Sequence, residues 1–429
     1  MDATAALRRP PFGSNPVVGD RGTKTQRRIL SAALEAFAEV GFHDTHVELI
    51  TKKAGCSRPS FYQYFSSKDD VFWELAAGLG RTMIDQADNL GAITPDAHGV
   101  LVLRYWLLDY SVLYEQHAPV FSAFPAARRD HVPFAAGSKV ISERLGQSLI
   151  RRVEGDHREL GVDSLATGIV TMVTRCNFYW HSRVAPASLS RDQFIDGLAR
   201  LIHRVLVGPI PGVNASDGQS EIEDTRVRRW PAAKSTPRRA LGPSGERTRS
   251  RLITAGARVF RSRGYHETRV DDIVKQAGVS HGSFYRYFEN KDDLFFVLAN
   301  LASNQMSGLI DAFPTSSDEE ELRRWVEDWF NTYRSNGGVM SMWQEIELVD
   351  RRLEAMSQRA MASAYDRLVQ LLDRRGLGDP LVAALALLAL IERLPYSVFT
   401  LAHAQKSAAI DAMVIITRRG LINLDEPRD

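Results

Sequence analysis

Residues 25–75 read TQRRILSAALEAFAEVGFHDTHVELITKKAGCSRPSFYQYFSSKDDVFWEL, and residues 248–298 repeat this stretch as TRSRLITAGARVFRSRGYHETRVDDIVKQAGVSHGSFYRYFENKDDLFFVL. The two stretches align without gaps at an offset of 223, and 23 of the 51 aligned positions are identical. Farther on, LRYWLLDYSVLY from residue 103 matches LRRWVEDWFNTY from residue 322 at an offset of 219. The chain is therefore a duplication of one structural unit.

Each copy of the first block predicts a pair of helices followed by a turn. Apolar residues in 29–40 share one helical face, and Gly41 ends that helix. A capping box from Thr45 (TxxE) opens a second helix, and the related motif from Thr268 (TxxD) opens its counterpart. Glycine in the following Gly-x-Ser turn supplies a backbone conformation that other residues resist.

A third short helix is predicted over 58–64, and over 281–287 in the second copy. Phe61 and Phe65 lie four residues apart on its inward face, whereas Tyr62 points away from them. Two short helices joined by a glycine-containing turn form a helix-turn-helix. The same geometry also occurs in helix pairs that serve only packing, so this reading stays open at this point.

The pattern G-[FY]-x-x-T-x-V-x-x-I-x-x-x-A-G-[CV]-S-x-x-S-F-Y-x-Y-F-x-x-K-D-D occurs in both copies and resembles the DNA-binding domain of TetR-family bacterial transcriptional regulators. The resemblance implies that the third helix enters the major groove of DNA. It implies phosphate contacts from Thr45, Tyr62, Tyr64, Lys68, Thr268, Tyr285, Tyr287 and Lys291. The residues that then face base edges are Arg58, Ser60, Gln63, His281, Ser283 and Arg286.

The two copies differ at the base-facing positions and agree at the phosphate-facing ones. Arg58 becomes His281, and Gln63 becomes Arg286, while the tyrosines and the lysine are the same. We therefore expect two unlike half-sites and an asymmetric operator.

The fold class expected is all-α, with two tandem TetR-like units that form a pseudo-dimer within one chain. The last two long helices of each half are expected at about 163–184 and 191–207, then at 380–404 and 408–422. The expected segments are a disordered tail (1–22), a first DNA-binding domain (23–70), a first ligand-binding and dimerisation domain (71–208), a linker (209–245), a second DNA-binding domain (246–293) and a second ligand-binding and dimerisation domain (294–425).

Aromatic residues recur at four-residue spacing in each C-terminal half. They form either an ordinary hydrophobic core or the wall of a pocket for an apolar, lipid-like effector. The candidate lining residues are Trp106, Tyr110, Tyr114, Phe121, Phe178, Tyr179, Trp325, Trp329, Tyr333, Trp343, Tyr396 and Phe399. Both halves can hold such a pocket, or one of the two can be vestigial.

The composition sets limits on other functions. The 54 Lys and Arg residues against 52 Asp and Glu give a net charge of +2, so a nucleic-acid site must come from local placement of charge. Two cysteines, Cys56 and Cys176, exclude a disulfide framework and a four-thiolate zinc site. No apolar run reaches the length that crosses a bilayer, and residues 1–23 lack the apolar core of a signal peptide. We therefore expect a cytoplasmic protein without contact to membranes.

No catalytic motif is present, so we expect no enzyme activity, no cofactor and no metal site. The pair His43-x-x-His46 lacks a third ligand nearby and is better explained as surface. The alternative function is a helix-turn-helix protein that shapes DNA or binds proteins without sequence choice.

The function expected from the resemblance is a sequence-specific repressor that a small apolar effector releases from DNA. The tandem arrangement is similar to that of actinobacterial repressors of lipid-import and lipid-metabolism genes. Its partners would be a double-stranded operator and the effector, with further self-association on DNA.

Overall fold

The computed structural model describes residues 20–129, 132–154, 162–182, 184–210, 242–314, 318–346, 351–374, 379–400 and 404–422. Over these residues the chain is helical, and its only β pairing is an isolated bridge between Ile93 and Val153. By contact density the chain divides into two units, Met1–His181 with Phe194–Gly212, and Ser182–Gln193 with Val213–Asp429. The tail expected at 1–22 and the linker expected at 209–245 fall almost wholly outside the described residues.

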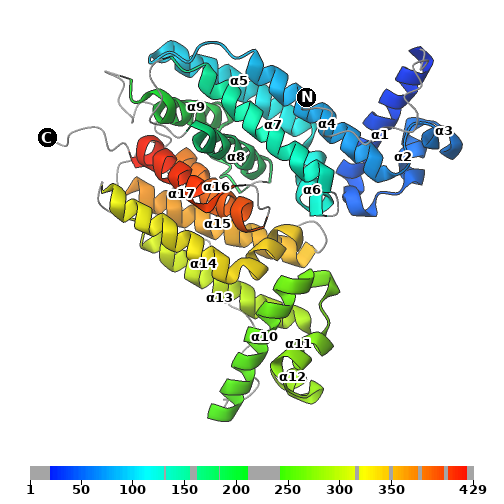
Figure 1. The fold of residues 1–429 in the computed structure, drawn as a ribbon, viewed down its shortest axis with the longest axis vertical. Helices are drawn as coiled ribbons and strands as arrows, with labels where there is room; N and C mark the ends of the chain where they lie inside the picture. Colours follow the sequence, from blue (N-terminus) through cyan, green and yellow to red (C-terminus); the bar gives the residue numbers. More distant parts are fainter. Residues whose placement is uncertain are drawn as a thin grey trace. The chain divides into compact units, whose positions relative to one another are not determined.

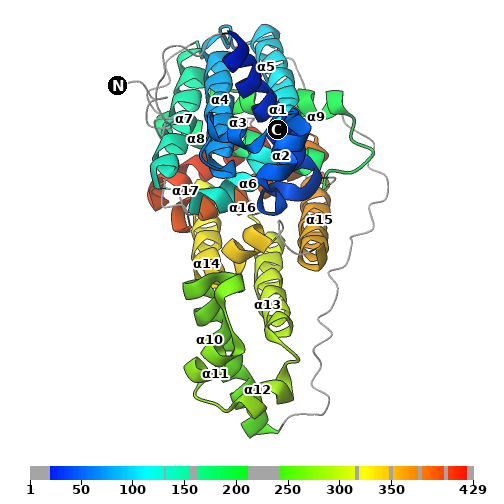
Figure 2. The ribbon, with the colours of Figure 1, turned by 90° about the vertical axis from the view of Figure 1, so that its right-hand side faces the viewer.

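Each unit begins with three helices that follow the repeated stretch of sequence. In the first copy they are α1 (Asp20–Asp44), α2 (Val47–Ala54) and α3 (Arg58–Tyr62), and in the second copy α10 (Pro243–Glu267), α11 (Val270–Ala277) and α12 (His281–Tyr287). Figure 1 shows α1, α2 and α3 grouped at one end of the first unit, and Figure 2 shows α10, α11 and α12 grouped at one end of the second. The expected helix-turn-helix is therefore present twice.

Glycine interrupts the first helix of each copy at the predicted place. Gly41 has φ 80° and Gly264 has φ 76°, values that favour glycine, so α1 and α10 kink there and continue for one short turn. A second left-handed glycine, Gly55 or Gly278, ends the next helix.

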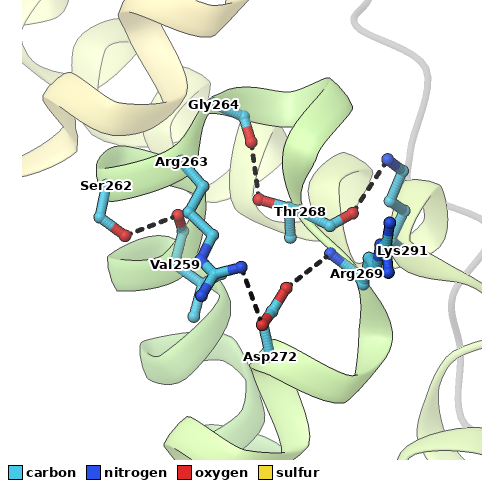
Figure 3. A network of polar contacts seen from close by, with 8 residues as sticks. All are labelled: Val259, Ser262, Arg263, Gly264, Thr268, Arg269, Asp272 and Lys291. Carbon is cyan, nitrogen blue, oxygen red and sulfur yellow. Dashed lines mark hydrogen bonds and ion pairs between the residues drawn. The ribbon is translucent and has the colours of Figure 1, made fainter.

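The predicted N-cap positions of the second helices, Thr45 and Thr268, are wrong, because each helix begins one residue later. His46 and Arg269 occupy the N-cap positions, because the two threonine side chains turn back toward the kink instead. The hydroxyls of Thr45 and Thr268 donate to the carbonyl oxygens of Gly41 and Gly264 at 2.6 Å each. In the second copy, the backbone N–H of Arg269 donates to the carboxylate of Asp272 at 3.2 Å (Figure 3).

An arginine of the first helix closes the turn after the second helix in both copies. Arg28 donates to the carbonyl oxygens of Ala54 and Gly55, and Arg251 donates to those of Ala277 (2.6 Å) and Gly278 (3.2 Å). These carbonyls end a helix and have no partner within it, so the guanidinium satisfies acceptors that would otherwise depend on water.

Longer helices complete each unit. The first unit has α4 (Lys68–Asp88), α5 (Ala97–Gln116), α6 (Ala118–Arg129), α7 (Val132–Arg151), α8 (Val162–His181) and α9 (Arg191–Val207). The second has α13 (Lys291–Asp311), α14 (Glu319–Ile346), α15 (Arg351–Asp373), α16 (Pro380–Phe399) and α17 (Lys406–Ile415), and α17 runs on into a π-helical segment, Ile416–Ile422. The helices α8 and α16 end three to five residues earlier than the sequence predicted.

Matching ion pairs show that the duplication extends through the C-terminal halves. Arg104 of α5 lies 2.5 Å from Asp196 of α9, and Arg323 of α14 lies 2.7 Å from Asp411 of α17. The two arginines are equivalent residues of the repeated second block. The same pair of helices is therefore tied together in both copies.

One described helix, Pro380–Phe399, is long and apolar enough to cross a membrane. Its 18-residue apolar window is 89% buried inside the structure, which is the condition of a core helix rather than of a membrane span.

Candidate functional site

The third helix of each copy presents one tyrosine to the surface and buries its phenylalanine. Tyr62 is 54% exposed and Tyr285 is 56% exposed, whereas Phe61 and Phe284 are fully buried. A buried ring next to an exposed ring fixes the rotation of these short helices, as the sequence predicted. Each helix is also capped by a serine, because Ser57 accepts from the N–H of Ser60, and Ser280 from that of Ser283.

The other residues expected to face DNA divide by exposure. Those exposed are Arg58, Gln63, His281 and Arg286, and those half-buried are Ser60, Tyr64, Ser283 and Tyr287. The helix α12 spans the predicted residues, whereas α3 ends at Tyr62, two residues earlier than predicted, so Gln63 and Tyr64 follow it. In both copies the exposed residues of this segment accompany the exposed tyrosine.

An acidic residue on the preceding helix pairs with the first residue of the third helix. Arg58 forms an ion pair with Glu48, and the imidazole of His281 contacts the carboxylate of Asp271. Glu48 and Asp271 are equivalent positions of the repeat, and the sequence predicted them as the acidic residues of the capping boxes, not as partners of the third helix. Their shared acidity next to a basic residue at the same spacing was the signal that could have identified them.

Lys68 and Lys291 are placed differently from the expectation of a phosphate contact. The ammonium group of Lys68 donates to the carbonyl oxygens of Phe42 at 2.8 Å, His43 at 2.7 Å and Thr45 at 3.0 Å. It also lies 4.9 Å from the centre of the Phe42 ring. Burial lowers the pKa of Lys68, and the nearby carboxylates of Asp69 and Asp44 oppose this shift.

Lys291 repeats this arrangement in the second copy. Its ammonium group donates to the carbonyl oxygen of Thr268 at 3.0 Å (Figure 3). It also donates to the carbonyl oxygen of Tyr265 at 2.9 Å and lies 4.7 Å from the centre of the Tyr265 ring. Both lysines are the first residues of their helices, α4 and α13. Each therefore ties the start of a long helix to the loop after the glycine kink.

The side chains of Thr45 and Thr268 do not fit the expected contact with DNA. Thr45 is fully buried and Thr268 is 1% exposed, and both hydroxyls already donate inside the protein. These threonines support the loop on which the second helix begins. Fewer side chains of each copy therefore face outward toward DNA than the sequence predicted.

Different ion pairs join the first two helices in the two copies. In the second copy, Arg263 lies 3.0 Å from Asp272, which also accepts from the backbone of Arg269 (Figure 3). In the first copy, Lys53 lies 2.6 Å from Glu39 instead. The two copies thus keep one scaffold but stabilise it with residues at different positions.

The aromatic candidates of the first unit lie where α5 faces α8. The hydroxyl of Tyr110 lies 2.7 Å from that of Thr174, and burial raises the pKa of Tyr110. Tyr114 stacks on Phe121 at 4.4 Å and on His181 at 5.3 Å. Next to them, the guanidinium of Arg175 lies 3.8 Å from the ring centre of Phe178 and 5.0 Å from that of Tyr179.

Several buried polar atoms of the first unit have no hydrogen-bond partner among the described residues, and three of them lie near the aromatic candidates. These three are Nε1 of Trp106, Oγ of Ser111 and Oδ1 of Asn177, carried by α5 and α8. A buried donor or acceptor without a partner is costly, so such atoms suggest a ligand or water at that place.

In the second unit both indole groups are satisfied by the protein, that of Trp325, the equivalent of Trp106, and that of Trp329, which stands where the first unit has Tyr110. Trp325 donates to the carbonyl oxygen of Leu309 at 2.8 Å, and Trp329 donates to that of Ile391 at 2.7 Å. Tyr333 is fully buried and stacks on Phe399. Tyr396 is buried beneath the guanidinium of Arg393, and the side chain of Trp343 lies outside the described residues.

The histidine pair and the two cysteines are the remaining residue types that could carry metal or thiol chemistry. In the part of the chain that the structure describes, no three His, Cys, Asp or Glu side chains are grouped to hold a metal ion. Burial raises the pKa of Cys176, which keeps that thiol protonated, and Cys56 is half-buried in the turn before α3.

Comparison with known proteins identifies the repeated helices. The family model described as "Bacterial regulatory proteins, tetR family" matches residues 29–75 and 252–298. The chain is 49% identical over 55 residues to an uncharacterised HTH-type transcriptional regulator of Bacillus subtilis, YdgC, covering 13% of this chain and 28% of the relative. It is 30% identical over 135 residues to the HTH-type transcriptional activator FasR of Mycolicibacterium smegmatis, covering 31% and 61%.

A third relative is the fatty acid metabolism regulator protein of Bacillus subtilis, 45% identical over 47 residues, which cover 11% of this chain and 24% of that protein. The chain thus spans less than two thirds of the length of each of these relatives. These relatives are transcriptional regulators by name, which agrees with the expectation that the chain is not an enzyme.

Two solved structures are similar to parts of the chain. A FadR fatty acid degradation regulator of Bacillus halodurans is 21% identical, with a TM-score of 0.34, and covers 42% of this chain and 97% of that one. A TetR-family regulator of Syntrophomonas wolfei is 19% identical, with a TM-score of 0.33, and covers 39% and 92%. The two family matches show that residues 29–75 and 252–298 are two tandem domains of the kind described for the tetR family of bacterial regulatory proteins.

Proposed function

We propose that this chain is a transcriptional regulator that binds one asymmetric operator with both of its helix-turn-helix domains. The observation that carries the proposal is the outward face of α3 and α12. Both helices expose an equivalent tyrosine, Tyr62 or Tyr285, while the residues beside it differ. Common contacts to phosphate and divergent contacts to bases are what two unlike half-sites require.

The two helix-turn-helix domains can bind one operator together if a single chain folds like a dimer of two chains that each carry one such domain. We propose that α8 and α9 of the first copy pair with α16 and α17 of the second, as a pseudo-dimer. The tether raises the effective concentration of one copy near the other to the order of mM, which favours pairing within the chain. Two reading helices then reach successive major grooves about 34 Å apart.

The effector site is proposed between α5 and α8 of the first unit. Flat aromatic side chains there, Tyr110 and Tyr114, suit an apolar body, and the unpartnered Nε1 of Trp106 suits a polar group. We propose that binding of a lipid-like effector there releases a repressor from DNA, in the cytoplasm. The fatty acid regulator of Bacillus subtilis among the relatives supports the lipid link by its name.

Selection of binding sites from random DNA tests the operator proposal. The native chain is expected to select two half-sites of different sequence. The variant Arg58→His, Pro59→Gly, Gln63→Arg gives the first domain the outward residues of the second, and it is expected to select an inverted repeat. If both proteins select no sequence at all, the chain is instead a sequence-tolerant DNA-binding protein.

A further inference from the structure

Helix α5 exposes a row of apolar side chains on the face opposite its buried aromatic residues. Of the seven large apolar side chains that are exposed in the described part of the chain, three lie on this helix. They are Leu101 at 47% exposure, Tyr105 at 63% and Val112 at 42%. Leu108 lies between them and is half-buried. On the other face of the same helix, Trp106 is 3% exposed.

The second copy of this helix is polar at the same positions. At the offset of 219, the four apolar residues correspond to Glu320, Arg324, Glu327 and Asn331 of α14. Asn331 there accepts a hydrogen bond from Lys406 of α17 at 3.1 Å. Since α14 folds with a polar surface at this place, the fold itself does not require the apolar row. The row is a property of the first copy alone.

The spacing of the row is that of a coiled-coil seam. Its apolar members and the exposed polar residue at each end follow one another at intervals of three, four, three, four and three residues. In order they are His98, Leu101, Tyr105, Leu108, Val112 and Glu115. Alternating intervals of three and four keep side chains on one helical face toward a partner helix.

The row is complementary to itself when two such helices run antiparallel. With a two-fold axis between Tyr105 and Leu108, Tyr105 of each copy faces Leu108 of the other. Leu101 then faces Val112 of the second copy. At both ends, His98 then faces Glu115 of the second copy. In the adjoining row Arg104, which lies 2.5 Å from Asp196 of its own chain, faces Asp109 of the second copy.

We infer that α5 pairs antiparallel with α5 of a second copy of this chain. A two-fold interface uses the same surface on both partners, so it requires the self-complementarity that this row has. The matching face of the other half of the chain is charged and offers no apolar counterpart. The surface goes beyond the proposed function, because it joins two chains that each already carry two DNA-binding domains.

The association is expected to be weak in free solution. A stable interface buries about 800 Å² on each partner, and one helix pair with six facing residues provides less than that. Two chains bound to neighbouring sites on DNA have a raised effective concentration, so the same contact becomes cooperative binding there.

Light scattering over a series of protein concentrations tests the inference. The native chain is expected to pass from 48.0 kDa toward twice that mass as concentration rises. The variant Leu101→Glu, Tyr105→Arg, Leu108→Glu, Val112→Asn carries the residues of the second copy, and it is expected to stay at 48.0 kDa. Val40→Arg is the matched control, because Val40 is a 43% exposed apolar residue of α1 that is Arg263 in the second copy. This control is expected to associate like the native chain.

Cross-linking tests the direction of the pairing. In a Cys56→Val background, a chain with Leu101→Cys is mixed with a chain with Val112→Cys, and a copper–phenanthroline oxidant is added. A disulfide-linked dimer is expected from the mixture and not from either chain alone. A dimer from Leu101→Cys alone would mean a parallel contact and overturn the inference.

The outcomes separate this inference from the pseudo-dimer. A native chain that stays at 48.0 kDa at every concentration and binds neighbouring operators independently would overturn the α5 contact and leave the pseudo-dimer intact. A dimer that persists in the four-residue variant, even when dilute, would overturn both, because the chains would then be joined through other helices.

Discussion

The ammonium nitrogen of Lys68 lies 3.0 Å from the carbonyl oxygen of Thr45, and Lys291 lies at the same distance from Thr268 in the second copy. Lys68 is the first residue of α4, whose far end is tied to α7 through the hydrogen bond between Asp88 and Ser148 at 2.5 Å. One helix therefore touches both the loop that begins the helix-turn-helix and the body of the unit. A shift of α4 on effector binding would move that loop directly.

Replacement of Lys68 by methionine is expected to destabilise the first domain by about 1–2 kcal/mol, since three carbonyl oxygens lose their donor. DNA affinity should fall with this loss of order, but the slope of affinity against salt concentration should stay the same. Titrations at several salt concentrations measure this slope. A slope reduced by about one would instead mean that the ammonium group contacts phosphate. Lys52→Met, at an exposed lysine of α2, is the control for a simple loss of charge.

The equivalent tryptophans Trp106 and Trp325 give a matched pair. Replacement of each by phenylalanine removes a similar volume from a buried site, but only Trp325 donates to a carbonyl oxygen, that of Leu309. Trp325→Phe is therefore expected to cost about 1–2 kcal/mol more than Trp106→Phe in denaturant unfolding. Equal losses would show that Nε1 of Trp106 has a partner of its own, and they would remove the support for a polar effector group there.

His203 makes the first unit sensitive to acid. It is 1% exposed, its Nε2 lies 2.9 Å from the carbonyl oxygen of Thr94, and burial lowers its pKa while that hydrogen bond opposes the shift. Below a pH of about 6.5 the unfolded chain binds a proton that the folded chain resists, so stability is full above this pH and falls as pH decreases. The variant His203→Gln keeps an amide nitrogen near the same place and cannot titrate. The stability of the native chain relative to this variant should fall between pH 7 and pH 5, and a constant difference would contradict the assignment.

The helix-turn-helix could be predicted from sequence because local signals coincide there. Gly41 and Gly55 need left-handed backbone conformations, and the buried Phe61 fixes the inward face of α3, with Phe65 buried just after the helix. Because the block occurs twice, the same residue types recur at the equivalent positions of the second copy and support the prediction for the first. These features depend on residues close together in the chain.

The contacts of Lys68 and Thr45 could not be predicted in the same way. Their partners are main-chain carbonyl groups, which every residue has, so no pattern of side chains marks them. The direction in which a lysine turns at the start of a helix depends on whether a loop offers acceptors nearby. For the same reason the polar partners of Trp325 and Trp329 appeared only with the packing of the helices.

The central claim is that two non-equivalent domains of one chain hold DNA together, each through an exposed tyrosine. Binding of an operator fragment by Tyr62→Ala, Tyr285→Ala and the double variant tests it most directly, with Leu301→Ala, another exposed residue, as the control. A hydrogen bond to a charged phosphate contributes about 1.5–3 kcal/mol, so each single variant should lose at least about tenfold in affinity and the double variant about a hundredfold. Native affinity in the double variant would contradict the account.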